Sequence, residues 1–226
     1  PTGSPCASGG GGAAPTTCPH GTPPPATAAV VVAPTPDQDG PAPARVRAQR
    51  GAAREALARA AALAGCPDVS FEKTSERGRP VPTPSGWHWT ISHDRWFVAG
   101  AVCEGGPLGV DLEHVALRRR ELVERVADQE ERRLLGEGAA PLDSVGFARL
   151  WTSKEAVLKA EGIGLPGLTR TRLVAVDGPH LTWVDYDGAR RAVLHTHLAE
   201  HMISLCVREA ATPPRVVWHL PGESAG

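Results

Sequence analysis

The order in which strand-like and helix-like segments follow one another is the feature that most constrains the fold of this chain. Three segments within residues 87–115 are dense in Val, Ile, Phe and Trp and are separated by turn residues, a pattern that is typical of β-strands. Further segments of this kind lie within residues 172–207, and Asp187-Gly188 between two of them predicts a hairpin turn. Helix-like segments precede each group of strands. This order predicts an α+β fold.

Helices are expected in three places. The Ala- and Arg-rich segment 44–65 ends in Gly, as helices often do. A second helix begins where Asp128 and Glu131 have the spacing of a capping box. The third is expected at 144–161, and a short strand is expected at 68–74.

The chain contains two loosely similar stretches, which suggest two similar lobes. Residues 90–102 and 195–207 each begin with polar, His-bearing sequence and continue with small and apolar residues. We therefore expect an N-terminal lobe at 45–110, a C-terminal lobe at 111–210 and a C-terminal extension at 211–226.

Residues 1–44 differ in composition from the rest of the chain. They are crowded with Pro, Gly, Ala and Thr and contain no aromatic residue. Such a segment buries too little apolar area to offset the entropy that ordering would cost. We therefore expect a disordered Pro/Gly/Ala-rich tail.

Charge and cysteine content narrow the function classes. The formal net charge of −1 gives no basic field for nucleic acid or an anionic membrane, and no apolar run is long enough to span a bilayer. The five cysteines are scattered and lack Cys-x-x-Cys spacing, which favours a reduced, cytoplasmic protein without structural zinc. We expect neither a nucleic-acid nor a membrane partner.

Two acidic residues stand together in the third predicted strand. Residues i and i+2 of a strand point to the same face, so Asp111 and Glu113 project together while Val110 and Leu112 pack behind them. Two carboxylates this close favour a hard divalent cation such as Mg²⁺. The alternative is a solvated strand end with two ordinary surface acids.

The predicted helix at 144–161 turns a lysine toward its own apolar side. At about 100° per residue, Lys154 falls within the apolar arc, while Glu155 and Lys159 lie at its edge. Lysines on such a face can supply positive charge to phosphates, and a glutamate can ligate a metal or take a proton. The alternative is a lysine whose stem packs while its ammonium reaches water.

Two further places offer groups that bind anions. Ser92-His93 ends a predicted strand, and the loop at 76–80 presents Arg77 and Arg79 from a turn fixed by Gly and Pro. A structural histidine and solvated surface arginines are the alternatives. His195, His197 and His201 could form a zinc site, but no cysteine or acid completes a ligand set, and pairing within a sheet face is the expected role of these residues.

Four motifs, in order along the chain, resemble those of the 4′-phosphopantetheinyl transferases of the pseudo-dimeric, surfactin-synthetase-activating type, which activate synthases of secondary metabolism. The resemblance spans roughly residues 45–207, and the last two motifs, about forty residues apart, are quite specific as a pair. The motifs are Gly78-Arg79-Pro80, Ser92-His93, Gly109-Val110-Asp111-Leu112-Glu113, and Trp151-Thr152-Ser153-Lys154-Glu155 followed by Lys159.

The resemblance implies a fold and a reaction. It implies two similar α+β lobes related by pseudo-twofold symmetry, with the active site at their interface, in a protein that we expect to be a monomer. The family transfers 4′-phosphopantetheine from coenzyme A to a serine of an acyl or peptidyl carrier protein and releases 3′,5′-ADP.

The resemblance also implies roles for residues. Asp111, Glu113 and Glu155 match the Mg²⁺ ligands. Glu155 is the expected base, with Glu113 acting through a water as its rival, and Lys159 neutralises charge during transfer. The expected contacts to coenzyme A are Lys154, Lys159, His93 and Arg79 at the pyrophosphate, with Arg47, Arg50 and Arg54 as candidates for the 3′-phosphate.

Two other functions remain open at this point. The same acids and lysines would serve a Mg²⁺-dependent phosphoester or nucleotide hydrolase, which needs no carrier protein. A non-catalytic carrier-binding module is the second alternative, and loss of a metal ligand would favour it.

Overall fold

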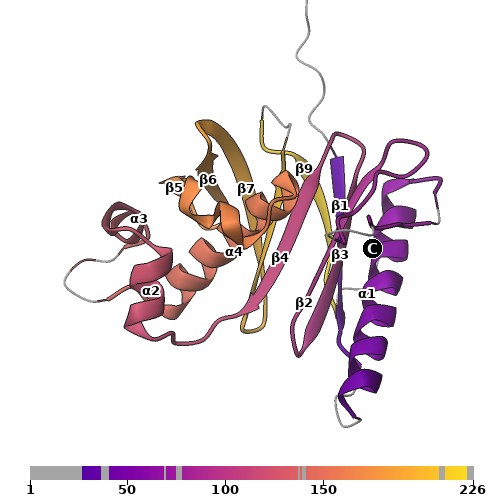
Figure 1. The fold of residues 1–226 in the computed structure, drawn as a ribbon, viewed down its shortest axis with the longest axis horizontal. Helices are drawn as coiled ribbons and strands as arrows, with labels where there is room; N and C mark the ends of the chain where they lie inside the picture. The colour runs from indigo at the N-terminus through magenta and orange to yellow at the C-terminus, as the bar shows by residue number, and fades with distance from the viewer. Residues whose placement is uncertain are drawn as a thin grey trace, which may run out of the picture.

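The computed structural model describes residues 27–36, 41–68, 70–74, 78–136, 138, 141–208 and 212–222. Its helices and strands form two sheets, each with one long helix on its outer face (Figure 1). No helix within these residues is long and apolar enough to cross a membrane.

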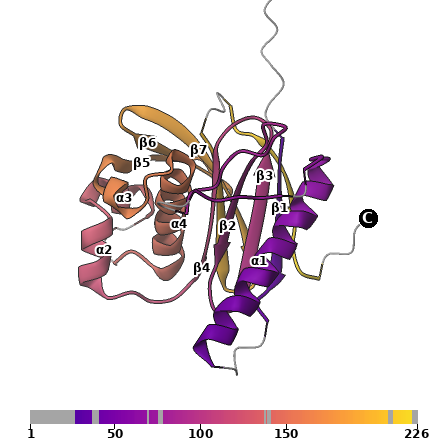
Figure 2. The same ribbon diagram turned by 45° about the vertical axis from the view of Figure 1, so that its right-hand side comes forward.

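The first sheet has four strands in the order β2-β3-β1-β9. Strand β1 lies antiparallel to β3 and parallel to β9, so both of its edges are paired. Helix α1 packs on this sheet (Figure 2). The bounds are β1 Thr27–Pro34, α1 Ala42–Ala64, β2 His88–His93, β3 Phe97–Cys103 and β9 Arg215–His219.

The second sheet has five strands in the order β4-β8-β7-β6-β5. Helix α4 covers one face of this sheet. Helices α2 and α3 and a 3-10 helix, η1, pack in the same cluster as α4, and α3 and η1 contact the edge strand β5. The bounds are β4 Leu108–His114, α2 Arg120–Val126, α3 Gln129–Leu134, α4 Ser144–Glu161, η1 Leu165–Arg170, β5 Thr171–Val176, β6 Leu181–Tyr186, β7 Ala189–Leu198 and β8 His201–Val207.

The two sheets share one core because alternate residues of their strands face each other. Val30 of β1, Ala101 of β3, Val110 of β4 and Leu205 of β8 belong to a single buried cluster. The intervening residues of each sheet pack against its own helix, α1 or α4. The result is a four-layer arrangement in which the edge strands β2 and β4 lie beside each other (Figures 1 and 2).

A glycine brings α4 onto the edge of the second sheet. A Cβ atom at Gly109 of β4 would overlap the carbonyl oxygen of Ala156 in α4. Only a residue without a side chain permits this approach. The close contact places the C-terminal half of α4 directly over β4, the strand that carries Asp111 and Glu113.

Most of the predicted elements are confirmed. The strands predicted within 87–115 and 172–207 are present, with the turn between β6 and β7 at Asp187-Gly188. The helices at 44–65 and 144–161 are present within a few residues, and Asp128 and Glu131 form both hydrogen bonds of the capping box.

The predicted tail at 1–44 is wrong where the structure describes it. Residues 27–34 form β1, a fully paired strand, and α1 begins at Ala42. The Ala- and Val-rich run needs no aromatic residue, because its small side chains fill the space between α1 and the second sheet. Residues 1–26 lie outside the described residues.

Three other boundaries differ from expectation. The extension predicted at 211–226 contains β9, which completes the first sheet, so the chain returns to the first sheet after it has formed the second. Strand β4 begins at Leu108, so the second sheet starts before the boundary expected at 110. The strand predicted at 68–74 is reduced to one isolated bridge between Lys73 and Pro80.

Candidate active site

Asp111 lies at the edge of the second sheet, where β4 meets β2 and α4. Its side chain is buried, with 5% of the residue exposed. One carboxylate oxygen, Oδ1, accepts hydrogen bonds from Ser92 Oγ at 3.0 Å and from Lys159 Nζ at 2.7 Å. The other oxygen, Oδ2, is buried without a hydrogen-bond partner among the described residues. A buried, unpartnered carboxylate oxygen needs a cation or a donor to satisfy it.

Lys159 joins the three elements at this point. Besides Asp111, its ammonium donates to Ser92 Oγ at 2.9 Å and to the carbonyl oxygen of Val110 at 3.0 Å. The sequence predicted that Lys159 and Asp111 act at one site, and the structure brings these two residues into contact.

Glu113 and Glu155 both lie close enough to Asp111 for its negative charge to raise the pKa of their carboxyl groups. Burial raises the pKa of the Glu113 carboxyl, and the negative charge of Asp111 raises it further. Burial and Asp111 likewise raise the pKa of Glu155, while Lys159 opposes this. Glu113 accepts hydrogen bonds from Trp151 Nε1 at 3.2 Å and Arg118 at 3.4 Å. The two glutamates therefore share an environment of partly buried negative charge.

The three carboxylates suit a hard divalent cation in kind. Carboxylate oxygens are the ligands that Mg²⁺ prefers, and the unpartnered Oδ2 of Asp111 is an atom that a cation would satisfy. Within the described part of the chain, however, no three His, Cys, Asp or Glu side chains are placed to hold a metal ion. Sharing one ion would therefore require the three carboxylates to move closer together.

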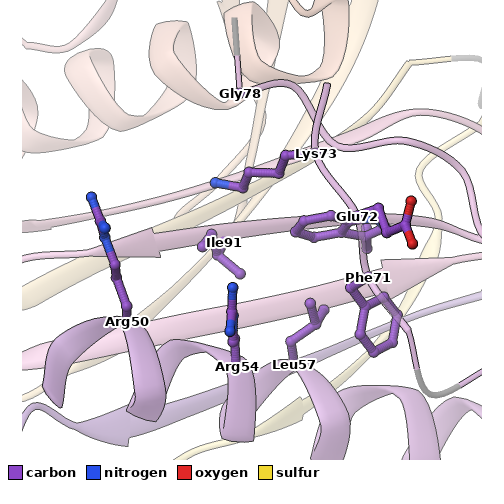
Figure 3. A pocket seen from close by; sticks show the side chains of 9 residues that line it. Arg50, Arg54, Leu57, Phe71, Glu72, Lys73, Gly78 and Ile91 are labelled. Atoms are coloured by element: carbon purple, nitrogen blue, oxygen red, sulfur yellow. The ribbon is translucent and has the colours of Figure 1, made fainter. Parts of the chain in front are cut away.

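A cavity of about 640 Å³ opens between α1 and the loop that precedes β2. In Figure 3, Arg50 and Arg54 rise from α1, and Lys73 points across the cavity from the opposite side. Phe71 and Trp89 form an edge-to-face pair, with ring centroids 5.7 Å apart, and also line the cavity. The cavity therefore combines aromatic surface with three cations.

A second cavity of about 290 Å³ adjoins the first and leads toward Lys159. Both are lined by Lys73, and Arg79 and Lys159 line the second. Burial lowers the pKa of Lys73, and the positive charges of Arg50, Arg54 and Lys159 lower it further. Lowering of this kind shows cations held near one another, an arrangement that favours a bound polyanion.

His93 borders the same group of cations. Burial lowers the pKa of the His93 imidazole, and the charges of Lys159 and Lys73 add to this effect. Of the residues predicted to contact coenzyme A, Arg50, Arg54, Arg79 and Lys159 line the adjoining cavities. His93 lines neither cavity, although it lies close enough to Lys159 and Lys73 for their charges to lower its pKa. Arg47 is exposed on α1 and lines neither cavity.

The prediction that Lys154 contacts a phosphate is wrong. Only 3% of this residue is exposed, and its ammonium lies 2.7 Å from one carboxylate oxygen of Glu131. It also donates to the carbonyl oxygen of Val126 at 2.8 Å. Glu131 in turn caps α3 and accepts from the backbone N–H of Leu173 at 2.8 Å. Lys154 therefore joins α3 and β5 to α4 inside the C-terminal lobe.

Lys73 is a candidate functional residue that the sequence motifs do not include. The sequence predicts only a short strand there, whereas the structure places Lys73 at the lining of both cavities. Its position five residues before Gly78-Arg79-Pro80 is the signal that was present in the sequence. The bridge between Lys73 and Pro80 brings Lys73 close to Arg79, and both side chains line the second cavity.

Comparisons with known proteins find one family repeatedly. Residues 107–206 match the model of the 4′-phosphopantetheinyl transferase superfamily. The chain is 30% identical over 155 residues to the 4′-phosphopantetheinyl transferase psf-1 of Bacillus pumilus. The matched stretch covers 66% of this chain and 64% of that protein. It is 32% identical over 99 residues to the 4′-phosphopantetheinyl transferase ffp of Bacillus subtilis, covering 43% of each.

The chain thus spans 64% and 43% of the lengths of these two curated relatives. The matched residues 107–206 include Asp111, Glu113, Glu155 and Lys159. Over this segment the chain is similar to the 4′-phosphopantetheinyl transferase superfamily, the family that its motifs resemble.

Proposed function

We propose that this protein transfers 4′-phosphopantetheine from coenzyme A to a serine of an acyl or peptidyl carrier protein, releasing 3′,5′-ADP. One observation carries the proposal: Asp111, Lys159 and Ser92 meet beside cavities lined by several cations, in a chain whose residues 107–206 match this superfamily. Coenzyme A carries a pyrophosphate and a 3′-phosphate, so a cluster of cations beside acidic residues suits it.

The two cavities suggest how coenzyme A would be divided between them. Arg50, Arg54 and Lys73 surround the larger cavity, whose volume and aromatic wall suit an adenine nucleotide with its 3′-phosphate. Arg79 and Lys159 line the smaller cavity nearer Asp111, where the pyrophosphate would lie. Arginine and lysine are the usual partners of phosphate oxygens.

We propose Asp111, Glu113 and Glu155 as the residues that would hold Mg²⁺. When bound, the ion would polarise the pyrophosphate and offset charge that develops on the leaving phosphate. Lys159 would place its ammonium near the same oxygens and, in the absence of the ion, holds Asp111 in position.

The chain's own residues supply proton transfer and positioning. The serine hydroxyl attacks the β-phosphorus, the new oxygen–phosphorus bond forms as the bond to 3′,5′-ADP breaks, and the serine proton passes to a carboxylate. Glu155 is the base that we favour: burial and the charge of Asp111 raise its pKa, which makes it a stronger base, and it lies one helical turn from Lys159 on α4. Glu113, acting through a water, is the rival.

We also infer that the two lobes are related by a pseudo-twofold axis and that the protein acts as a monomer. Each lobe consists of a mainly antiparallel sheet with one long helix, α1 or α4, on its outer face. The candidate site lies where the edge strands β2 and β4 meet, as expected for a site between two related halves.

Mass spectrometry of a purified carrier protein tests the proposal. After incubation with this protein, coenzyme A and Mg²⁺, the carrier should gain the mass of phosphopantetheine, and a chelator should prevent the gain. Coenzyme A alone forms the control arm. Cleavage of coenzyme A without carrier would favour the hydrolase alternative, and carrier binding without any mass gain would favour a non-catalytic module.

A further inference from the structure

A chain of buried side-chain hydrogen bonds crosses the second sheet beneath α4. Thr152 Oγ1 lies 2.6 Å from Ser204 Oγ, which lies 2.8 Å from His195 Nδ1. On the other side of the ring, His195 Nε2 lies 2.8 Å from Thr182 Oγ1, which lies 3.1 Å from Ser153 Oγ. None of the five residues is more than 2% exposed. The chain therefore begins and ends on α4 and passes through β8, β7 and β6.

Two members of this hydrogen-bonded series, Ser204 and His195, lie in the same transverse row of the sheet as Asp111. Ser204 is paired with Asp111 across β4 and β8, and with His195 across β7 and β8. Residues directly opposite each other in antiparallel strands project to the same face. The row therefore runs from Asp111 at the sheet edge through Ser204 to His195, all on the face that α4 covers.

The residues of α4 that contact the row are aligned with its candidate catalytic groups. Thr152, Glu155 and Lys159 stand at positions i, i+3 and i+7 of the helix and so share one face. Thr152 contacts Ser204 in the row, while Lys159 contacts Asp111 at its end. Fixing Thr152 on this row therefore fixes the direction in which Glu155 and Lys159 point.

Directional bonds matter here because apolar packing alone tolerates small rotations. A helix with its side chains has a radius of about 5–6 Å, so a rotation of about 10° moves a side-chain end by about 1 Å. A misplacement of about 1 Å can lower a rate by about 10²-fold. Hydrogen bonds are lost over similar displacements and resist such a rotation.

The histidine at the centre of the chain keeps one charge state at neutral pH. Burial lowers the pKa of His195 to about 3, and the nearby charge of Arg149 acts in the same direction. The ring therefore stays neutral in the folded protein and bonds one hydroxyl on each side.

We propose that the buried chain of Thr152, Ser204, His195, Thr182 and Ser153 is a positioning device for the reaction. It sets the rotation of α4 on the sheet so that Glu155 and Lys159 meet Asp111. This inference rests on the proposed function of that site. The five hydrogen-bonded residues act through α4 and do not touch the substrate.

A matched pair of threonine variants tests the proposal by kinetics. Thr182→Val removes the hydroxyl that bonds His195 and Ser153. Thr171→Val removes an equally buried hydroxyl on β5, the strand farthest from β4, which donates to the carbonyl oxygen of Gly167 at 3.0 Å. Carrier loading is measured at a temperature at which circular dichroism shows both variants folded.

Thr182→Val should lower kcat at least tenfold and change KM for coenzyme A by a smaller factor, because only Lys159 of the proposed coenzyme A contacts lies on α4, whereas Arg50, Arg54 and Lys73 do not. Thr171→Val should leave kcat within twofold of the unsubstituted protein. Thr182→Ser, which keeps the hydroxyl, should restore kcat. Equal losses of kcat in Thr182→Val and Thr171→Val would mean that the buried hydrogen bonds serve stability alone, and would overturn the proposal.

A crystal structure of the double variant Thr182→Val/Ser204→Ala gives a test that does not depend on transfer. We expect α4 to rotate and the contact between Lys159 Nζ and Asp111 Oδ1, 2.7 Å here, to lengthen or break. An α4 that keeps its place would refute the positioning role even if the protein transfers phosphopantetheine. Conversely, a displaced α4 would support that role even if the unsubstituted protein loads no carrier and the proposed function fails.

Discussion

Lys159 and Asp111 meet with 2.7 Å between Nζ and Oδ1, and this contact joins α4 to the edge strand β4. Ser92 of β2 bonds both residues, so the contact also reaches the other sheet. A pair of opposite charges at the meeting point of three elements is a place where a phosphate and a cation can both be bound.

The two lysines of the α4 motif should respond differently to substitution. Lys159→Met should lower kcat for carrier loading by about 10²-fold, because one stabilising charge at the reacting phosphate is lost. Lys154→Met should lower the free energy of unfolding by about 3–5 kcal/mol, because it leaves Glu131 buried without its partner. Steady-state kinetics and urea unfolding measure the two effects, and the reverse pattern would contradict the assignment of Lys154 to the fold.

Arg54 should act on coenzyme A binding through the 3′-phosphate. Arg54→Ala should raise KM for coenzyme A about tenfold, as loss of one charged hydrogen bond of about 1.5 kcal/mol would. With 3′-dephospho-coenzyme A as substrate, Arg54→Ala should change KM little. Arg47→Ala, which removes an exposed arginine of the same helix, is the control and should change neither KM. An equal penalty with both substrates would place the 3′-phosphate elsewhere.

His195 should make the protein less stable in acid. Its pKa is about 3 in the folded protein and about 6.5 when unfolded, so between these values the unfolded chain binds a proton that the folded chain does not. Stability should therefore fall as pH drops below about 6.5, by at most about 1.4 kcal/mol for each pH unit. Urea unfolding at pH 7, 6 and 5 measures this, and His195→Gln should show a shallower dependence on pH. Identical slopes would exclude a neutral buried ring.

Two glycines should respond to alanine with opposite signs. Gly109→Ala should destabilise the protein by about 1–3 kcal/mol and lower kcat, because the new Cβ would push Ala156 and α4 away from β4. Gly51→Ala in α1 meets open space and should stabilise the protein by about 0.5–1 kcal/mol through helix propensity. Thermal unfolding gives both values, and a harmless Gly109→Ala would show that α4 does not depend on this close approach.

The strands around Asp111 and the ends of α3 and α4 were predictable because their causes are local. Alternating and clustered apolar residues specify a strand wherever it finally packs, and the Asp128–Glu131 capping box needs only three residues of spacing. The pairing of Asp111 with Glu113 on one strand face follows from the same local geometry.

Strand β1 was not predictable in this way. Its three valines favour a strand, but the run is short and stands within Pro-rich sequence, and it becomes a strand because β3 and β9 pair with both of its edges. Those partners lie more than sixty residues away along the chain, and no local pattern contains them.

The sequence by itself determined which residues are candidates for the chemistry and on which face each lies: Asp111 with Glu113 on one face of a strand, and Lys154 on the buried side of a helix. Only the tertiary structure decided what those faces meet. Lys154 pairs with Glu131 in the core, while Lys159 pairs with Asp111 beside the second cavity. The physical reason is that helical and strand periodicity fix direction, whereas the partner of a buried charge depends on how distant segments pack together.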